Sequence, residues 1–275
     1  MPGLLYIVAT PIGNLEDITA RALRVLREVA VVACEDTRHT AKLLAHFGIR
    51  TSMVSYHQHN EARRTKELLG RLAAGEDVAL AADAGTPLIS DPGARLVNMA
   101  IEMGFRAVPV PGPSAVAAAL SASGLPADEF RFCGFLPAKA AQRRKKLESL
   151  ATETATLVFY EAPHRTIEML RDLSEFLGER QVVLARELTK LHEEFLRGRP
   201  SEVLASLGSR AEVRGEITVI VGPPGEAEPR LSDEDIQREV QELIRSGVPK
   251  AAAVKAVARR FGLPKRRVYS LVAEG

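Results

Sequence analysis

Short apolar runs alternate with amphipathic stretches through the first 110 residues of the chain. The runs have the length of strands, and apolar residues at helical spacing separate them. They lie at residues 4–10, 29–34, 52–56, 78–82 and 107–110. Strands that alternate with helices are typical of a mostly parallel sheet covered on both faces. This pattern predicts an α/β domain over residues 1–112.

The second half of the chain keeps this mixture with less regularity. Apolar runs again favour strands, at residues 130–135, 157–160, 182–185, 192–196 and 217–221. Only a short helical stretch at residues 201–207 lies among the last three, which suggests antiparallel pairing. We expect a second α/β domain over residues 113–222, with a cleft between the two domains as a common location for a ligand.

The stretch from Gly222 to Pro229 has the composition of a linker. Beyond it, residues 231–275 predict a small helical unit, with Ser232 as a helix cap and Gly262 as a stop. A helix, a Gly-containing turn and a basic helix resemble a helix-turn-helix. From Lys250 onward seven Lys or Arg residues oppose one acid, so the net charge of +2 hides a basic end. This charge favours nucleic-acid phosphates, although a solvated helical face would show the same pattern.

The composition indicates a globular soluble protein, with 46% hydrophobic and 26% charged residues. No apolar run approaches the roughly 18 residues of a membrane span, and the start lacks the features of a signal peptide. Cys34 and Cys133 stand far apart in apolar runs. We therefore expect buried free thiols and a reducing, cytoplasmic setting.

The segment from Asp83 to Gly93 follows a predicted strand and precedes a predicted helix. Open α/β sheets bind ligands at such turns. Gly85 and Gly93 let the backbone approach a ligand closely, and Pro87 and Pro92 stiffen the turn. Eleven residues are long for such a connection, which favours a binding role over a purely structural loop.

Several chemistries are excluded because their motifs are missing. The chain contains no Gly-x-Gly, no Gly-x4-Gly-Lys and no Gly-x-Ser-x-Gly. These absences argue against a dinucleotide fingerprint, a phosphate-binding loop and a serine-hydrolase elbow. His57 and His59 could share one face of a strand, but no third ligand at clear spacing completes a metal site, and none is expected. What remains is transfer of a group from a nucleotide-like cofactor held by backbone loops.

Short motifs occur in a fixed order along nearly the whole chain. They are Thr10–Leu15, Glu35–Arg38, Asp83–Pro87, Ser90–Gly93, Pro109–Ala115, Gly134–Pro137, Tyr160–Arg165, Arg186–Lys190 and Gly215–Thr218. By these motifs the chain resembles the ribosomal RNA small subunit methyltransferase I family, a branch of the tetrapyrrole methylase superfamily. Each motif is short, but their joint order is highly specific.

The resemblance implies two α/β domains with the cofactor in the cleft between them, plus the helical C-terminal unit. It implies S-adenosylmethionine as cofactor and methylation of a cytidine ribose 2′-hydroxyl in the decoding region of small-subunit (16S) ribosomal RNA. The RNA or the assembled small subunit would be the partner. A homodimer is implied as well, since dimers are common in the superfamily.

The candidate cofactor residues of the first domain lie in loops after predicted strands, which would share one sheet edge. By resemblance, the loop from Gly85 to Ile89 holds the methionine end, and Phe135 and Leu136 add an apolar wall. The full set is Pro11, Asp83, Gly85, Thr86, Pro87, Ile89, Ser114, Ala115, Phe135 and Leu136. The alternative for any one of these residues is that it only shapes a turn and does not contact a cofactor.

A ribose hydroxyl is a poor nucleophile at neutral pH and gains from a base or a nearby cation. The candidates for this catalytic role are Arg38, His57, Glu61, Arg186, Glu187 and Lys190. Glu187 with Lys190, or His57 with Glu61, are the foremost pairs, and the base among them stays open. The structural alternatives are a surface ion-pair network for the first pair and a helix N-terminal cap for the second.

Basic residues outside the C-terminal unit extend the predicted RNA surface. The four like charges at residues 143–146 repel one another unless they meet phosphate, although a solvated helix face is the alternative. The RNA-binding set is Arg63, Arg64, Arg143, Arg144, Lys145, Lys146, Lys265, Arg266 and Arg267. We expect the C-terminal unit to dock RNA while the cleft carries out the chemistry.

Two other functions fit part of the pattern. A tetrapyrrole methyltransferase would share the fold and the cofactor, but it would leave the basic C-terminal end without a role. A non-catalytic ribosome-binding protein would use the basic end, but it would not bind adenosylmethionine.

Overall fold

The computed structural model describes residues 1–208, 212–225, 233–261 and 263–273. The chain divides into two compact units. The first unit contains Met1–Ala122 together with Arg186–Glu194, and the second contains Ser123–Ala185 and the chain from Phe195 onward. A segment from the second half of the sequence therefore belongs, by its contacts, to the first unit.

The first unit is built on a five-stranded parallel sheet in the order β3-β2-β4-β1-β5. Its strands are β1 (Leu5–Val8), β2 (Val31–Cys34), β3 (Met53–Ser55), β4 (Val78–Ala81) and β5 (Ala107–Val110). Each strand lies inside one of the apolar runs, so the α/β prediction is confirmed. β2 and β4 are buried along their whole length, as interior strands with helices on both faces should be.

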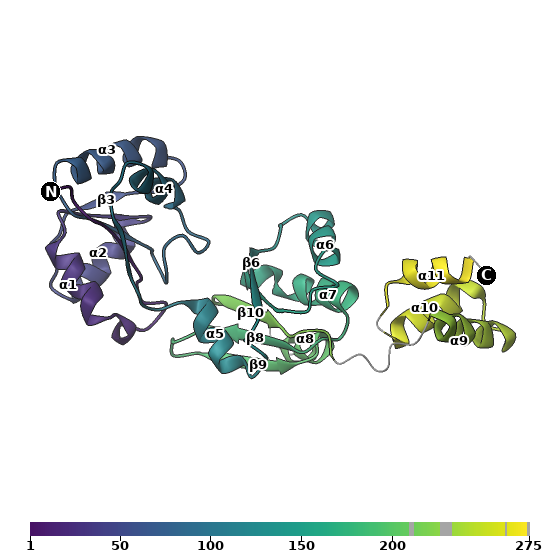
Figure 1. Cartoon of the computed structure of the whole chain (residues 1–275). Helices are drawn as coiled ribbons and strands as arrows, with labels where there is room; N and C mark the ends of the chain where they lie inside the picture. Colours follow the sequence, from purple (N-terminus) through teal and green to yellow (C-terminus); the bar gives the residue numbers. More distant parts are fainter. Residues whose placement is uncertain (209–211, 226–232, 262, 274–275) are drawn as a thin grey trace. The chain divides into compact units, whose positions relative to one another are not determined.

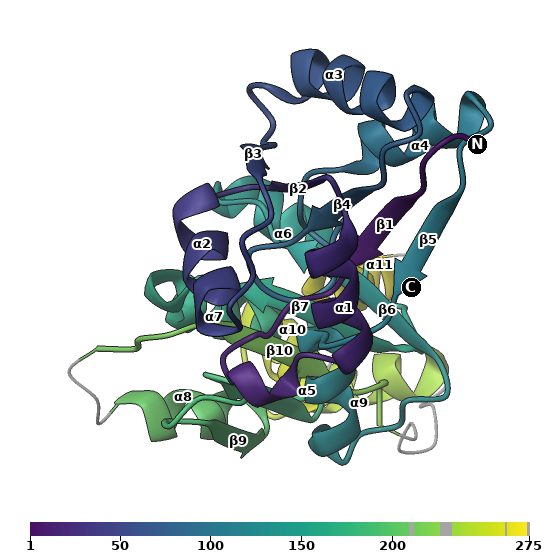
Figure 2. The same ribbon diagram turned by 90° about the vertical axis from the view of Figure 1, so that its left-hand side faces the viewer.

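Helices cover both faces of this sheet. The elements are η1 (Leu15–Asp17), α1 (Ala20–Glu28), α2 (Thr37–His46), α3 (Glu61–Ala73), α4 (Ala94–Glu102) and α5 (Ala115–Ser123). α1 and α2 pack on one face, and α3 and α4 pack on the other (Figure 1 and Figure 2). Leu68, Leu69 and Leu72 show why α3 packs this way, because their helical spacing places all three in one core.

The second unit has a sheet in the order β6-β7-β10-β8-β9. Its strands are β6 (Phe130–Phe135), β7 (Thr156–Glu161), β8 (Val182–Arg186), β9 (Glu194–Gly198) and β10 (Ile217–Val221). β6 pairs with β7 in parallel and β7 pairs with β10 antiparallel, so the sheet is mixed.

One core joins the strands of the second unit to its helices. The helical elements are α6 (Ala140–Glu148), η2 (Pro163–Arg165), α7 (Thr166–Leu177) and α8 (Pro200–Gly208). The sequence pattern had not singled out α7. Its Met169, Leu170, Leu173 and Leu177 follow helical spacing and are all buried in this core.

The predicted helical unit consists of α9 (Asp233–Arg245), α10 (Lys250–Arg260) and α11 (Lys265–Ala273). These helices share a small core of their own, which includes Val240, Val257 and Val268. The expected helix cap at Ser232 and the stop at Gly262 lie outside the described residues.

Both cysteines are free, but only Cys34 is buried as expected, and Cys133 is half-buried. Burial raises the pKa of each thiol. None of the described helices combines the length and the apolar character that a membrane crossing requires.

Candidate functional site

The loops that follow the parallel strands are tied to one another at the carboxyl edge of the first sheet. Thr10 and Gly85 exchange backbone hydrogen bonds of 2.9 and 3.0 Å, and the Thr10 hydroxyl donates to the Ala82 carbonyl at 2.9 Å. The Thr86 hydroxyl donates to the Pro113 carbonyl at 3.1 Å. The loops after β1, β4 and β5 therefore form one connected rim, at the edge where α/β sheets bind ligands.

The loop Asp83–Gly93 has an unusual backbone. Leu88 and Ser90 have φ angles of 71° and 66°. Gly93 has a φ of 134°, and a Cβ there would lie 2.6 Å from a methyl carbon of Leu80. Residues other than glycine rarely adopt a positive φ, and backbone strain of this kind concentrates at functional sites. The loop is therefore both strained and closely packed on β4.

The first-unit members of the predicted cofactor set all lie on or next to this rim. They are Pro11, Asp83, Gly85, Thr86, Pro87, Ile89, Ser114 and Ala115. Pro11, Gly85 and Pro87 are buried, whereas Ile89 is exposed. The Ser114 hydroxyl accepts the Ala117 amide at 3.5 Å in the first turn of α5. The start of a helix, which favours negative charge, therefore also lies at the rim.

Three carboxylates influence one another at the same edge. Asp83 accepts the Asp36 amide at 3.0 Å, which links the loop after β2 to the loop after β4. Burial, together with the charges of Glu35 and Asp83, raises the pKa of Asp91 to about 6. The edge thus combines backbone groups with negative charge, which suits a cationic ligand. In the described part of the chain, no group of His, Cys, Asp and Glu side chains is arranged to hold a metal ion.

The segment Arg186–Glu194 is the second strained loop of the first unit. Glu187 and Thr189 have φ angles of 53° and 66°. Among the described non-glycine residues, positive φ occurs in this loop and in Asp83–Gly93 and nowhere else. Lys190 pairs with Glu187 at 2.9 Å, whereas Arg186 pairs with Glu194 at 3.0 Å. The structure thus brings together the predicted pair Glu187 and Lys190.

Gly13 contacts this second loop directly. A Cβ on Gly13 would lie 2.4 Å from Lys190 Cγ and 2.9 Å from both the Leu188 carbonyl oxygen and the Thr189 hydroxyl. A glycine is therefore required for the loop after β1 to pack against the segment that carries Lys190. Sequence reasoning missed this role, although Gly13 stands in a motif directly after a strand.

The second predicted pair is arranged differently. His57 Nε2 lies 3.0 Å from Asn60 Nδ2, and the side-chain Oδ1 of Asn60 accepts the His57 backbone amide at 2.9 Å. His57 Nδ1 is buried without a hydrogen-bond partner. His57 is therefore engaged with Asn60 rather than with Glu61. The predicted pair, His57 and Glu61, follows the edge strand β3, and strands β2 and β4 lie between β3 and β1 in the sheet.

Arg38 lies after β2 and is well exposed. Its guanidinium binds both oxygens of Asp36, at 3.1 and 2.9 Å. These bonds, together with the Arg38 amide, lower the pKa of Asp36 to about 2. Arg38 is thus an accessible cation whose direction is fixed at the start of α2.

The two predicted cofactor residues of the second unit differ in exposure. Phe135 is 55% exposed, whereas Leu136 is 2% exposed and belongs to the core of its unit. The Phe135 ring is therefore the apolar surface of this pair that a ligand can reach.

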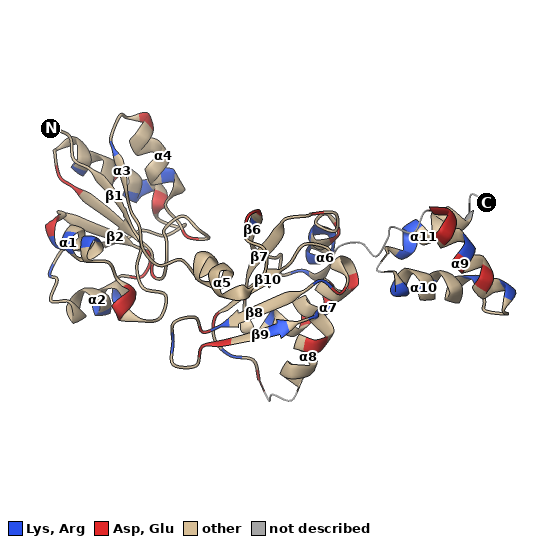
Figure 3. Cartoon of the chain, turned by 60° about the horizontal axis from the view of Figure 1, so that its bottom comes forward, with Lys and Arg blue, Asp and Glu red and all other residues tan. Residues whose placement is uncertain are grey.

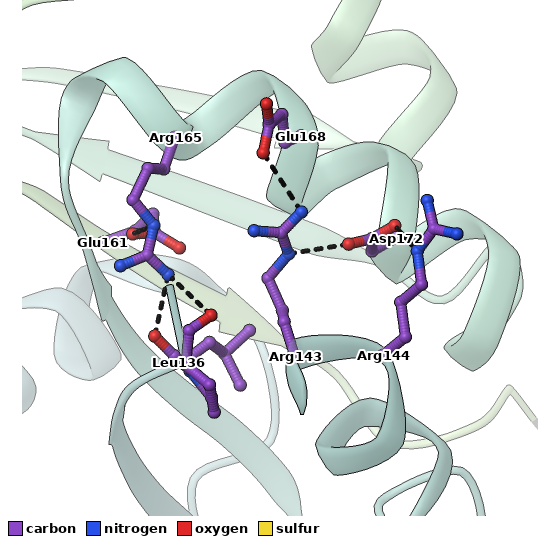
Figure 4. Close-up of polar contacts among 8 residues, drawn as sticks. Leu136, Arg143, Arg144, Glu161, Arg165, Glu168 and Asp172 are labelled. Atoms are coloured by element: carbon purple, nitrogen blue, oxygen red, sulfur yellow. Dashed lines mark hydrogen bonds and ion pairs between the residues drawn. The ribbon is translucent and has the colours of Figure 1, made fainter. Parts of the chain in front are cut away.

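The basic run on α6 divides into buried and exposed charges. The Arg143 side chain is 3% exposed and donates to Asp172 at 2.6 Å and to Glu168 at 3.1 Å (Figure 4). Arg144 is exposed and donates to the other oxygen of Asp172 at 2.9 Å. Lys145 is exposed and Lys146 is half-buried. Arg143 is therefore paired in the interior of the unit, unlike the exposed Arg144 and Lys145.

The remaining basic candidates lie on α3 and α11. Arg63 is exposed, whereas Arg64 is half-buried and pairs with Glu67 at 2.6 Å. Lys265 and Arg266 are exposed in the first turn of α11. Figure 3 shows basic residues on α10 and α11 and acidic residues at the start of α9, where Asp233 pairs with Arg267 at 3.2 Å.

Comparison with known proteins places this architecture in a family. The model of the Tetrapyrrole (Corrin/Porphyrin) Methylases matches residues 4–204. A similar solved structure is uroporphyrin-III C-methyl transferase from Thermus thermophilus complexed with S-adenyl homocysteine. It has a TM-score of 0.56 and 22% identity, over 80% of this chain and 97% of that chain. The chain therefore belongs to the tetrapyrrole methylase family, and the fold prediction is confirmed.

Relatives named ribosomal RNA small subunit methyltransferase I are similar over nearly their whole length. The relative from Synechocystis sp. is 46% identical over 273 residues, covering 99% of this chain and 98% of the relative. The relative from Pseudomonas aeruginosa is 50% identical over 272 residues, covering 97% and 95%. Within the tetrapyrrole methylases, the chain belongs to the ribosomal RNA small subunit methyltransferase I family, as its motifs predicted.

Proposed function

We propose that this chain uses S-adenosylmethionine to methylate the ribose 2′-hydroxyl of a cytidine in the decoding region of small-subunit (16S) ribosomal RNA. The observation that carries this proposal is the identity of 46% and 50% to near-full-length relatives that are small-subunit RNA methyltransferases by name. Both matches extend into the helical C-terminal unit, whereas the tetrapyrrole methylase model ends at residue 204. A basic unit beyond the shared fold favours an RNA substrate over a tetrapyrrole.

The rim of the first unit fits this cofactor. Adenosylmethionine is a sulfonium cation with an amino-acid end, and the rim offers backbone groups, a helix start and the carboxylates of Glu35, Asp83 and Asp91. When bound, the sulfonium supplies an electrophilic methyl group with a good leaving group, so alignment provides much of the rate. The proposed contacts are Pro11, Asp83, Gly85, Thr86, Pro87, Ile89, Ser114, Ala115, Phe135 and the backbone of Leu136.

For activation of the acceptor we favour Glu187 with Lys190. This pair sits on a strained loop that packs on Gly13, and Gly13 belongs to the same loop after β1 as Thr10 and Pro11 of the rim. A carboxylate can accept the 2′-hydroxyl proton while the oxygen bonds to the methyl carbon, and the Lys190 ammonium fixes its orientation. His57 is less suited because its ring is engaged with Asn60.

We propose that the RNA backbone contacts exposed and half-buried cations on several elements. Phosphate contacts of this kind position a nucleic acid, and base identity is read elsewhere. The proposed set is Arg63, Arg64, Arg144, Lys145, Lys146, Lys265, Arg266 and Arg267. We also propose that the protein acts in the cytoplasm as a homodimer, and light scattering after size-exclusion chromatography tests the oligomeric state.

The test is methyl transfer from radiolabelled adenosylmethionine to small ribosomal subunits that lack the modification. Naked ribosomal RNA and a tetrapyrrole precursor serve as parallel acceptors. Nuclease digestion and nucleoside analysis then locate the label. We expect it on a 2′-O-methylcytidine, with the subunit and RNA samples showing which form is the substrate.

Two outcomes of this assay contradict the proposal. Label on the tetrapyrrole alone would replace it with tetrapyrrole methylation. A chain that neither binds adenosylmethionine nor transfers label, yet still binds small subunits, would be a non-catalytic ribosome-binding protein.

A further inference from the structure

The segment Gly134–Pro137 at the end of β6 is shaped by a bulge. Phe132 lies opposite Val158 and Phe135 lies opposite Tyr160, with a register shift between Phe132 and Gly134. Residues three apart point to opposite faces of a regular strand, but the extra residue puts Phe132 and Phe135 on the same face. Both rings then contact Tyr160, with centroid distances of 5.0 and 5.6 Å.

Arg165 holds the other end of this segment. Its Nη2 donates to the carbonyl oxygens of Leu136 at 2.7 Å and Pro137 at 3.2 Å (Figure 4). A guanidinium presents its donors in a rigid plane. The two bonds therefore fix the path of the backbone directly after Phe135.

Glu161 fixes Arg165 in turn. Its Oε1 lies 3.3 Å from Arg165 Nε and accepts the Ala162 amide at 2.8 Å. The Glu161 side chain is fully buried, and burial raises its pKa while the charges of Arg165 and Arg143 lower it. Burying a carboxylate is costly unless the charge is paired, so the position of Arg165 is strongly specified.

We propose that Arg165, held by Glu161, is a positioning residue that keeps Phe135 in place as an apolar contact for S-adenosylmethionine. This inference rests on the proposed function, because Phe135 has that role only if the chain binds this cofactor. Phe135 is suited to it since its ring is exposed while Leu136 anchors the segment in the core. The motif Gly134–Pro137 then supplies the contact with the cofactor, and the motif Tyr160–Arg165 fixes the position of that contact.

The test compares two conservative variants of the full chain. R165K keeps the positive charge but loses the planar donor group. R180K is the matched control, because buried Arg180 also donates to two backbone carbonyls of the second unit, those of Ala151 at 2.6 Å and Glu153 at 2.9 Å. We expect R165K to raise the Kd of S-adenosylhomocysteine about tenfold by calorimetry, and R180K to change it less than about twofold. R165K should also raise the KM for adenosylmethionine more than it lowers kcat.

A double-mutant cycle with F135A separates positioning from general destabilisation. If Arg165 acts through Phe135, R165K should raise the Kd by less than about twofold in the F135A background. Circular dichroism checks that each variant is folded. If R165K does not fold, E161Q takes its place in the same cycle, with a smaller effect in the same direction.

Equal effects of R165K and R180K, or an effect of R165K that is unchanged in the F135A background, would show a purely structural role and overturn the inference. A wild-type chain that binds no S-adenosylhomocysteine would instead overturn the proposed function, and the inference with it.

Discussion

At the scale of single residues, backbone strain marks the two loops to which we assign binding and chemistry. Leu88 and Ser90 lie in one loop, and Glu187 and Thr189 lie in the other, all with left-handed φ. Each such residue costs about 1–3 kcal/mol, so the surrounding contacts must hold it in place. The hydrogen bonds of the rim and the contact with Gly13 provide this support.

Replacing Glu187 with Gln tests the proposed base. We expect kcat to fall about 100-fold or more, because an amide cannot accept the hydroxyl proton, with an unchanged Kd for S-adenosylhomocysteine. Steady-state methyl transfer and calorimetry measure the two quantities. E193Q is the control, since Glu193 lies in the same loop and accepts the Thr189 amide at 2.6 Å, a bond that Gln can keep. Equal activity of both variants would assign the base elsewhere, with His57 and Glu61 next in order.

Replacing Asp91 with Asn tests the electrostatics of the rim. Because the folded-state pKa of about 6 is above the ordinary 3.8, the folded state binds the proton more tightly. The contribution of Asp91 to stability is therefore fully present below about pH 4 and is lost as the pH rises through 6. A shift of two pKa units corresponds to at most about 3 kcal/mol, and partial exposure reduces this.

We therefore expect D91N to raise Tm relative to wild type at pH 8 by about 2–6 °C, with a difference that shrinks toward pH 4. Thermal unfolding of both proteins across this range measures the trend. D128N, at an exposed aspartate of the second unit, is the control. A difference in Tm between D91N and wild type that does not change with pH would contradict the raised pKa of Asp91 in the folded state.

At the scale of elements, one helix can divide a single basic run between the interior and the solvent. On α6, Arg143 enters an ion-pair group with Asp172 and Glu168 of α7, while Lys145 faces solvent. Removing one partner of such a buried pair typically costs about 3–5 kcal/mol. A loss of RNA binding after mutation of Arg143 would therefore report on folding. The exposed Lys145 is the position on α6 whose mutation tests RNA contact.

The first turn of α11 offers the sharper test of RNA contact. The double variant K265A/R266A should weaken binding of a decoding-region RNA. The plot of the logarithm of the binding constant against the logarithm of salt concentration should also become less steep, by about 1–2 in slope, because two phosphate contacts are lost. R260A is the control, since Arg260 of the neighbouring helix α10 pairs with Glu239 and is not among the proposed RNA contacts. Filter binding at several salt concentrations measures both quantities. An unchanged slope in the double variant would show that this face of α11 is simply solvated.

At the scale of the whole molecule, the core of the C-terminal helices contains residues of α9, α10 and α11 and their adjoining turns. Deleting residues 231–275 therefore removes a unit together with its own core. We expect the shortened chain to bind S-adenosylhomocysteine within about twofold of wild type and small-subunit RNA at least about tenfold more weakly. Calorimetry and filter binding provide the two values. Loss of cofactor binding in a folded shortened chain would contradict this division of labour.

The sequence predicted the strands of both sheets and most of the helices, because period and composition are local properties. The order of its motifs was enough to identify the family. It also singled out Glu187 with Lys190 as one of two candidate pairs, and the structure places their charged groups 2.9 Å apart. The sequence could not distinguish that pair from His57 and Glu61, because the difference lies in the Asn60 side chain that engages His57.

What the sequence by itself determined about this protein is its alternation of strands and helices, its family and the loops that form the rim. The tertiary structure alone decided the rest, since those outcomes depend on contacts between distant segments. Asp172, 29 residues along the chain, determines that Arg143 is buried. The segment that carries Lys190 requires a glycine at position 13, and a bulge in β6 turns Phe135 toward Tyr160. No local pattern encodes these partners, because each depends on how the chain packs around them.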